Sequence, residues 1–114
     1  MILSIIFALI AGAAWGMRER YHAEPRVFER LMGVEPEGWA GSKAWKRAYV
    51  NNDPGMPHKF GPNTFRDIWH FTGTLAKLLL VAACVLACSK GLVLVFALYA
   101  LHALIAHITY IALE

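Results

Sequence analysis

Residues 71–113 read FTGTLAKLLLVAACVLACSKGLVLVFALYALHALIAHITYIAL, in which only Lys77 and the lysine of Ser89-Lys90-Gly91 carry a formal charge. A membrane-spanning helix needs about 20 consecutive apolar residues, so this run is long enough for two. Ser89-Lys90-Gly91 interrupts the run and leaves room only for a tight turn. We therefore predict two spans, residues 64–88 and residues 91–113, that form an antiparallel helical hairpin.

A further apolar stretch, MILSIIFALIAGAAWGM at residues 1–17, contains no charged residue. As a helix it covers about 25 Å, slightly less than a hydrocarbon core of about 30 Å, so we expect this span to occupy residues 1–20. A secretory signal has basic residues before its apolar stretch, whereas Arg18 and Arg20 follow this one, which favours a retained span. The chain is thus predicted to be an all-α integral membrane protein. Its three transmembrane helices, one plus the hairpin, form a single membrane domain of residues 1–114.

The composition agrees with a membrane protein, because 58% of the residues are hydrophobic and 17% are charged, against about 45–50% and about 25% in soluble domains. All acidic residues except Glu114, and nine of the eleven Lys and Arg, lie between Arg18 and Asp67. This distribution excludes a soluble globular domain and a disordered charged tail. It also disfavours nucleic acid as a partner, because most of the net charge of +3 comes from a loop of mixed sign. The positive-inside rule predicts that loop 21–63 is cytoplasmic in a bacterial inner membrane, with the N-terminus outside and the C-terminus inside.

The loop of residues 21–63 is rich in aromatic residues and is expected to be folded. One short interfacial helix is predicted over Arg26–Met32, ended by Gly33. A second is predicted over Lys43–Val50, with Ser42 as its N-cap.

Aromatic residues are expected to anchor this loop at the membrane surface. Trp45 and Tyr49 lie four residues apart and share one side of the second predicted helix. They rest either on anionic headgroups or on the protein's own hairpin. Trp69 marks the interface at the start of the second span.

That span is expected to begin with Asn63 or Thr64 as the N-cap and with Asp67 in the first turn, where a negative charge suits the helix dipole. Asp67 and His70 are three residues apart on the predicted helix, so their side chains are expected to meet. Such a contact fixes the tautomer of the imidazole. As a hypothesis, His70 receives a lipid headgroup, a quinone-like head or a proton.

The polar groups of each hairpin helix share one face when the helices are drawn as wheels. In the second span, the residues within about 60° of the direction of Lys77 on the wheel are His70, Gly73, Thr74, Cys84 and Cys88. The third span has a polar face of Tyr99, His102, Ala103, Ala106, His107 and Tyr110, and a lipid face of Leu94, Leu98, Leu101, Leu104, Ile105, Ile108 and Ile111. Because the turn is centred near Lys90, we predict one inward-facing polar column. It pairs Lys77 with Tyr99 and His102, pairs His70 with His107 and Tyr110, and includes Thr74.

Ionisable groups inside a membrane are expensive and indicate a functional site by default. The alternatives are structural hydrogen bonds between helices, a Lys77 that snorkels to the surface, proton or ion handling, and ligation of a metal or haem. His102 and His107 are five residues apart and are not a ligand pair of the i,i+4 type. No metal site is therefore predicted, and the cofactor is unknown.

Small residues recur at four-residue steps in the first span, at Ser4, Ala8, Gly12 and Gly16. Such a ridge lets another helix approach closely, and this packing drives association in lipid. The ridge is predicted to pack either on the chain's own hairpin or on a second protein.

Part of the loop resembles a known group of sequences. The segments that carry the resemblance are Phe28-Glu29-Arg30, Trp39, Ser42–Tyr49, Asn52–Gly55, Phe60 and Asp67–His70. Their order is similar to the S-x-x-W-x-x-x-Y, D-P, D-x-W-H pattern of small, uncharacterised bacterial membrane proteins. The resemblance implies a specified loop structure anchored by Asp67, Trp69 and His70, and it implies no activity and no catalytic residues.

The sequence contains no phosphate-binding loop, no HExxH, no G-x-S-x-G and no carboxylate pair within a span. No catalytic residue is predicted. We expect a non-enzymatic accessory or assembly subunit that is embedded in the lipid bilayer. It is expected to pack as a homo-oligomer or in a larger membrane complex. The alternative is a small pore, or a metal- or cofactor-binding membrane protein, that uses the Lys and His column. A lipid-modifying membrane enzyme is the third possibility.

Overall fold

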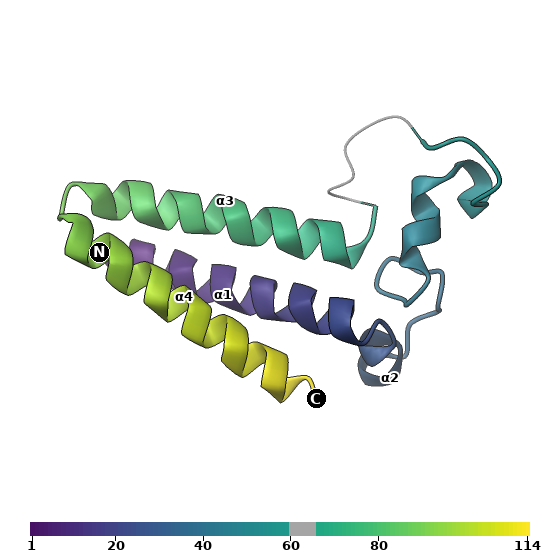
Figure 1. Ribbon diagram of the computed structural model, residues 1–114, viewed down its shortest axis with the longest axis horizontal. Helices are drawn as coiled ribbons and strands as arrows, with labels where there is room; N and C mark the ends of the chain where they lie inside the picture. The colour runs from purple at the N-terminus through teal and green to yellow at the C-terminus, as the bar shows by residue number, and fades with distance from the viewer. Residues whose placement is uncertain (60–65) are drawn as a thin grey trace.

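A computed structural model describes residues 1–59 and 66–114. These residues form helices and no strand, apart from one isolated bridge between Tyr49 and His58. The elements are α1 (Ile2–Ala23), α2 (Val27–Met32), the 3-10 helices η1 (Ala44–Ala48) and η2 (Val50–Asn52), α3 (Ile68–Cys88) and α4 (Leu92–Ala112) (Figure 1). The predicted all-α class is confirmed.

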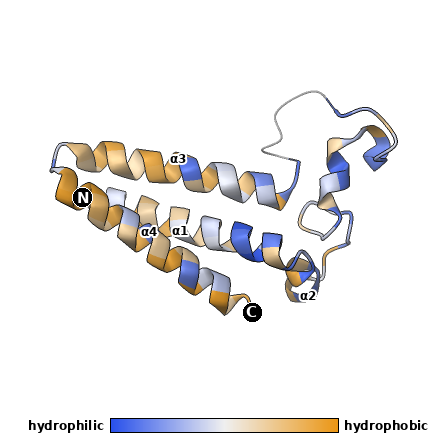
Figure 2. Ribbon diagram, in the orientation of Figure 1, coloured by the Kyte–Doolittle hydropathy of each residue, from blue (hydrophilic) through white to orange (hydrophobic). Residues whose placement is uncertain are grey.

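Three of these helices, α1, α3 and α4, are long and apolar enough to cross a membrane. Figure 2 shows that apolar residues dominate α3 and α4, whereas hydrophilic residues gather at the loop end of α1 and in the loop. The three predicted spans are therefore confirmed. The first helix extends beyond the predicted residue 20 to Ala23.

The predicted hairpin is present, since α3 and α4 run antiparallel and join at a tight turn (Figure 1). In this turn the amide of Lys90 donates to the carbonyl of Ala87 at 2.8 Å. Gly91 has φ of 102°, a value that L-residues with a side chain rarely adopt. Away from the turn the two helices diverge, and each packs more extensively on α1 than on the other (Figure 1).

The small-residue ridge of α1 allows this arrangement. A Cβ placed on Gly12 would lie 2.6 Å from the carbonyl oxygen of His102, and one on Gly16 would meet the carbonyl oxygen of Ala106. Ser4 and Ala8 are buried on the same helix. The ridge at Gly12 and Gly16 thus contacts the chain's own α4, as in the first of the two predicted alternatives.

The faces of the hairpin helices differ from the helical-wheel prediction. Leu98, assigned to the lipid face, is only 2% exposed and packs with Ala8, Ala83 and Ala87. Ile105 also faces inward, near Gly12. For these two residues the prediction was wrong because it opposed α3 to α4, whereas both helices pack on α1. Leu98 fits there against three alanines. Leu104, Ile108 and Ile111 of the same predicted lipid face are exposed, as expected.

The loop folds onto the end of the bundle. Tyr21, Val27, Phe28, Ala40 and Ile68 form a small hydrophobic core. The Tyr21 hydroxyl donates to the carbonyl of Gly41 at 2.5 Å. The amide of Ile68 donates to the carbonyl of Trp39 at 3.0 Å, so the loop is joined to the start of α3.

The loop helices match the prediction in one of two cases. The helix expected over Arg26–Met32 is confirmed as α2, which ends at Gly33 in a left-handed conformation with φ of 63°. Within the predicted Lys43–Val50 the chain forms the 3-10 helix η1 over Ala44–Ala48, followed by η2, rather than one continuous helix. Ser42 does not cap a helix, since its amide and hydroxyl both donate to the carboxylate of Glu29.

The start of α3 also differs from the prediction. Asp67 does not lie in the first turn but is itself the N-cap, with an extended backbone (φ −152°, ψ 166°) and a side chain that accepts from the amide of His70. The predicted caps Asn63 and Thr64, and Phe60, lie outside the described residues. α3 begins at Ile68 because a side-chain acceptor at position 67 satisfies an otherwise unpaired amide of the first turn.

Candidate functional site

A cleft of about 340 Å³ opens between α3 and α4 near the middle of both helices. α1 contributes one aromatic side chain to it, from Trp15. The full lining is Trp15, Ala76, Lys77, Leu80, Tyr99, His102, Ala103 and Ala106. The predicted meeting of Lys77, Tyr99 and His102 at one depth therefore agrees with the structure.

His102 is the most enclosed polar side chain of this cleft. The residue is 8% exposed, and both ring nitrogens are buried without a hydrogen-bond partner among the described residues. The imidazole is surrounded by aromatic rings, with its centroid 6.4 Å from that of Trp15 and 6.1 Å from that of Tyr99. Buried polar groups are normally paired, so an imidazole with two unpaired nitrogens indicates a missing partner.

Lys77 and Tyr99 line the cleft from α3 and α4, respectively, and both are exposed. Lys77 is exposed on α3 and Tyr99 is 59% exposed on α4. Lys77 is nine residues beyond Ile68, or about 14 Å along the helix at 1.5 Å per residue. In residues 1–59 and 66–114, no carboxylate lies within ion-pair distance of its ammonium group. A cation thus lies unneutralised deep within a span.

A narrower groove of about 100 Å³ adjoins the cleft at Lys77. Arg18 lines it, with its guanidinium carbon 4.6 Å from the centre of the Trp15 ring and 4.2 Å from that of Trp69. Arg18 also pairs with Glu19 at 2.7 Å. Cations stack favourably on aromatic faces, which keeps this arginine inside the helix packing. Thr74 and His70 line the same groove.

Arg18 was expected only to favour a retained first span and to set its orientation, and its place in this groove was not predicted. Two features of the sequence contain the information. Trp15 and Arg18 are three residues apart on one helix, so their side chains are neighbours. Gly73 provides the space, because a Cβ there would lie 2.9 Å from the Cδ of Arg18.

The predicted contact of Asp67 with His70 is present. One carboxylate oxygen accepts from the amide of His70 at 2.9 Å, and the other lies 2.8 Å from the ring Nδ1. Because a carboxylate only accepts hydrogen bonds, the proton must be on Nδ1, which leaves Nε2 directed away from Asp67. Asp67 is 4% exposed, so this pair is partly shielded from solvent.

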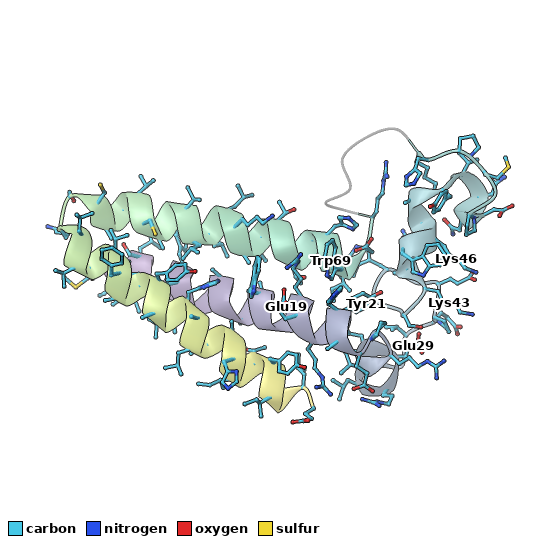
Figure 3. All side chains as sticks on the ribbon, viewed as in Figure 1. Glu19, Tyr21, Glu29, Lys43, Lys46 and Trp69 are labelled. Carbon is cyan, nitrogen blue, oxygen red and sulfur yellow. The ribbon has the colours of Figure 1, made fainter. Side chains whose placement is uncertain are left out.

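A third hollow, of about 190 Å³, lies where the loop meets the bundle. It is lined by Tyr21, His22, Pro25, Ser42, Trp45, Asp67, Trp69 and His70. Figure 3 shows Tyr21 and Trp69 at this end, between the helices and the loop. The indole nitrogen of Trp69 is buried with no hydrogen-bond partner among the described residues.

Two of the expected interface anchors, Trp45 and Tyr49, contact each other within the loop. Trp45 is 51% exposed and contacts Tyr49 edge-on, with ring centroids 6.3 Å apart. Tyr49 lies 4.3 Å from His58, measured between ring centroids. The outer side of Trp45 is open, whereas Asp67 is enclosed by the protein.

The predicted polar column is not formed as one unit. His107 is exposed on α4, and the ring of Tyr110 lies 5.3 Å from the guanidinium carbon of Arg20 rather than against His70. His70 instead contacts Asp67. The column divides because α3 and α4 diverge toward the loop end, where α1 separates them (Figure 1).

Three carboxylates of the loop are held by hydrogen bonds. The hydroxyl and amide of Ser42 lower the pKa of Glu29 below its ordinary value. A hydrogen bond from Arg30 lowers the pKa of Glu24, and one from Lys46 lowers the pKa of Glu37. These ionised groups fix the loop and lie away from the cleft.

The described residues contain no group of three or more His, Cys, Asp or Glu side chains arranged to hold a metal ion. Comparison with protein families, with curated proteins and with solved structures finds no match to this chain. The site is therefore interpreted from its own residues, and the resemblance of the loop to small bacterial membrane proteins stays a prediction.

Proposed function

We propose that this chain is a non-enzymatic integral membrane protein that binds a lipid-soluble molecule in the cleft of Trp15, Lys77, Tyr99 and His102. The observation that carries the proposal is the imidazole of His102, which is buried beside an open volume with both nitrogens unpaired. A buried polar group without a partner costs about 1–3 kcal/mol, which a bound molecule with a polar group would recover. The volume lies at the lower end of the range of about 300–1,000 Å³ found for small-molecule sites.

The position of the cleft suggests the route by which its ligand arrives. Lys77, Tyr99 and Ala103 line the cleft and are exposed. Their helices α3 and α4 are two of the three candidate spans, so the cleft opens toward the lipid rather than toward water. A molecule dissolved in the bilayer reaches His102 without crossing an aqueous phase.

Native mass spectrometry of the protein, extracted from its membrane in mild detergent, tests this proposal. We expect a small-molecule mass on the wild-type chain and its loss in Ala103→Phe, which fills the cleft. The matched control is Ala100→Phe, because Ala100 is also exposed on α4 but does not line the cleft. A wild-type chain without bound mass, or equal bound mass in the two variants, overturns the proposal.

A second proposal is that the protein is an accessory subunit of a homo-oligomer or a larger membrane complex. The specific support is α4, in whose apolar part 17% of residues are buried, against 33% for α1. Because Gly12 and Gly16 already contact α4, a partner would use the outer face of the hairpin and present a carboxylate to Lys77. The same mass spectra count chains, and loss of association in Lys77→Met but not in Lys90→Met supports this role.

The proposed location is a bacterial inner membrane with the N-terminus outside and the loop in the cytoplasm. Its support is the nine Lys and Arg of residues 18–66, compared with the single Lys90 in the opposite turn. Attaching a cytoplasm-active reporter to the C-terminus tests it, since activity is expected only if that end is inside.

A further inference from the structure

We propose that the ligand of the cleft is a lipophilic acid, bound as its anion with the charged group between Lys77 and His102. The inference rests on the proposed function and adds the chemical class of the ligand. It follows from the kind of polar group that the cleft presents, from a lysine of the cleft that has no carboxylate partner among the described residues, and from the shape of the remaining lining.

The polar groups of the cleft are rich in donors. Lys77 offers three N–H groups, Tyr99 one O–H and a neutral His102 one N–H. No Asp or Glu is among the described residues that line the cleft. These donors are matched by a ligand with acceptor atoms such as carboxylate or phosphate oxygens, while the second ring nitrogen of a neutral His102 is itself an acceptor.

The charge of the ligand follows from the neighbouring groove. Three ionisable groups line this groove, and two have acidic partners: Arg18 pairs with Glu19 at 2.7 Å and His70 with Asp67 at 2.8 Å. Lys77 is the third, and it has no carboxylate partner within the described parts of the chain. A neutral acceptor would satisfy His102 but would leave the ammonium group of Lys77 uncompensated in the hydrocarbon region. An anion pairs with both His102 and the ammonium group of Lys77.

The rest of the lining indicates a compact apolar body. Ala76, Leu80, Ala103 and Ala106 offer only hydrocarbon, and Trp15 adds an aromatic side chain. The imidazole lies near the Trp15 and Tyr99 rings, at centroid distances of 6.4 and 6.1 Å. Flat rings pack favourably among such groups. A carboxylate on an apolar, preferably aromatic, body therefore fits best.

The test compares an acid with its neutral isostere, 4-octylbenzoate with 4-octylbenzamide, on the full chain in nanodiscs of neutral phosphatidylcholine. Affinity is measured by calorimetry at pH 8, where the benzoate is ionised. We expect the wild-type protein to bind the benzoate about tenfold more tightly than the amide, an energy difference of about 1.4 kcal/mol. In Lys77→Met this preference is expected to disappear, because the benzoate loses more affinity than the amide does. Lys90→Met, which removes an exposed lysine of the turn, is the control and keeps the preference.

The outcomes separate this inference from the function on which it rests. Equal affinity for benzoate and amide, with loss of both in Ala103→Phe, overturns the anion but retains the binding cleft. Binding of both probes that is unaffected by Ala103→Phe, or binding of neither probe, overturns the cleft itself. An equal loss of both probes in Lys77→Met also overturns the anion, because the lysine then only shapes the cleft.

A parallel titration with monododecyl phosphate identifies the source of the anion. If monododecyl phosphate binds more tightly than the benzoate, the anionic group of the ligand is assigned as a phospholipid-type phosphate. If it binds more weakly, the group is assigned as a carboxylate.

Discussion

The carbonyl oxygen of His102 lies so close to Gly12 that a Cβ on this glycine would stand only 2.6 Å from it. One residue therefore serves two purposes. Its backbone forms the contact between α4 and α1, and its imidazole faces the cleft. The close approach of the two helices positions the unpaired nitrogens, so packing and binding are linked through His102.

This contact predicts that Gly12→Ala destabilises the fold rather than an oligomer. The added methyl group would meet the backbone of His102, which cannot move aside as a flexible side chain can. Overpacking of this kind costs about 1–3 kcal/mol. The measurement is the free energy of unfolding in an SDS titration. Ile10→Ala, on an exposed part of α1, is the control and should have a smaller effect. Wild-type stability in Gly12→Ala would show that the helices do not touch here.

The sequence predicted much of this arrangement because the signals are local. Apolar length determines the three spans, and Ser89-Lys90-Gly91 determines the turn. Once the turn is placed, Lys77 and His102 must lie at similar depth, and both line the cleft. The contact of Asp67 with His70 follows equally from a spacing of three residues.

The features that escaped prediction depend on residues far apart in the chain. In a membrane, an apolar side chain is similarly stable whether it faces lipid or another helix. The sequence of apolar residues in α4 therefore does not show that Leu98 is buried. That result depends on Ala8 of α1 and the alanines of α3. Likewise, serine is a preferred residue at helix N-caps, but Ser42 donates to Glu29, thirteen residues earlier.

The attachment of the loop to the bundle predicts an effect of Tyr21→Phe. The variant removes the hydrogen bond to the carbonyl of Gly41, whose net contribution is about 1 kcal/mol. We expect faster hydrogen exchange in residues 36–44, with unchanged exchange in the middle of α3 and α4. Tyr49→Phe is the control, since Tyr49 contacts His58 through its ring, with centroids 4.3 Å apart, and phenylalanine keeps this ring. If both variants exchange alike, the Tyr21 hydroxyl does not hold the loop.

The contact of Ser42 with Glu29 predicts a dependence of loop stability on pH. The pKa of Glu29 is lowered in the folded state, mainly by the hydroxyl of Ser42. Its contribution is therefore present above the ordinary value of 4.5 and is lost as the pH falls through the lower folded value. The amide proton of Ser42 donates to this carboxylate, so its NMR shift should titrate with a midpoint below 4.5. Ser42→Ala should move the titration of Glu29 upward, and a midpoint at or above 4.5 in the wild-type protein would contradict the contact.

The last prediction concerns Asp67, which accepts from both the amide and the ring of His70. Asp67→Ala removes both contacts and should cost about 1 kcal/mol, the usual value for loss of an N-cap. Asp67→Asn keeps one carbonyl oxygen for the amide but replaces the second oxygen with an NH₂ donor. We therefore expect Asp67→Asn to recover most of the stability but no longer to favour a proton on Nδ1 of the ring.

Nitrogen-15 NMR of His70 separates these two roles of Asp67. In the wild-type protein, neutral His70 should carry its proton on Nδ1, because the carboxylate only accepts hydrogen bonds. Both variants should shift the ring toward the Nε2-protonated tautomer, whereas His58, which lies against Tyr49, serves as an internal reference and should not change. An unchanged His70 tautomer in Asp67→Asn would mean that Asp67 acts only as the cap of α3 and does not orient the imidazole at the groove.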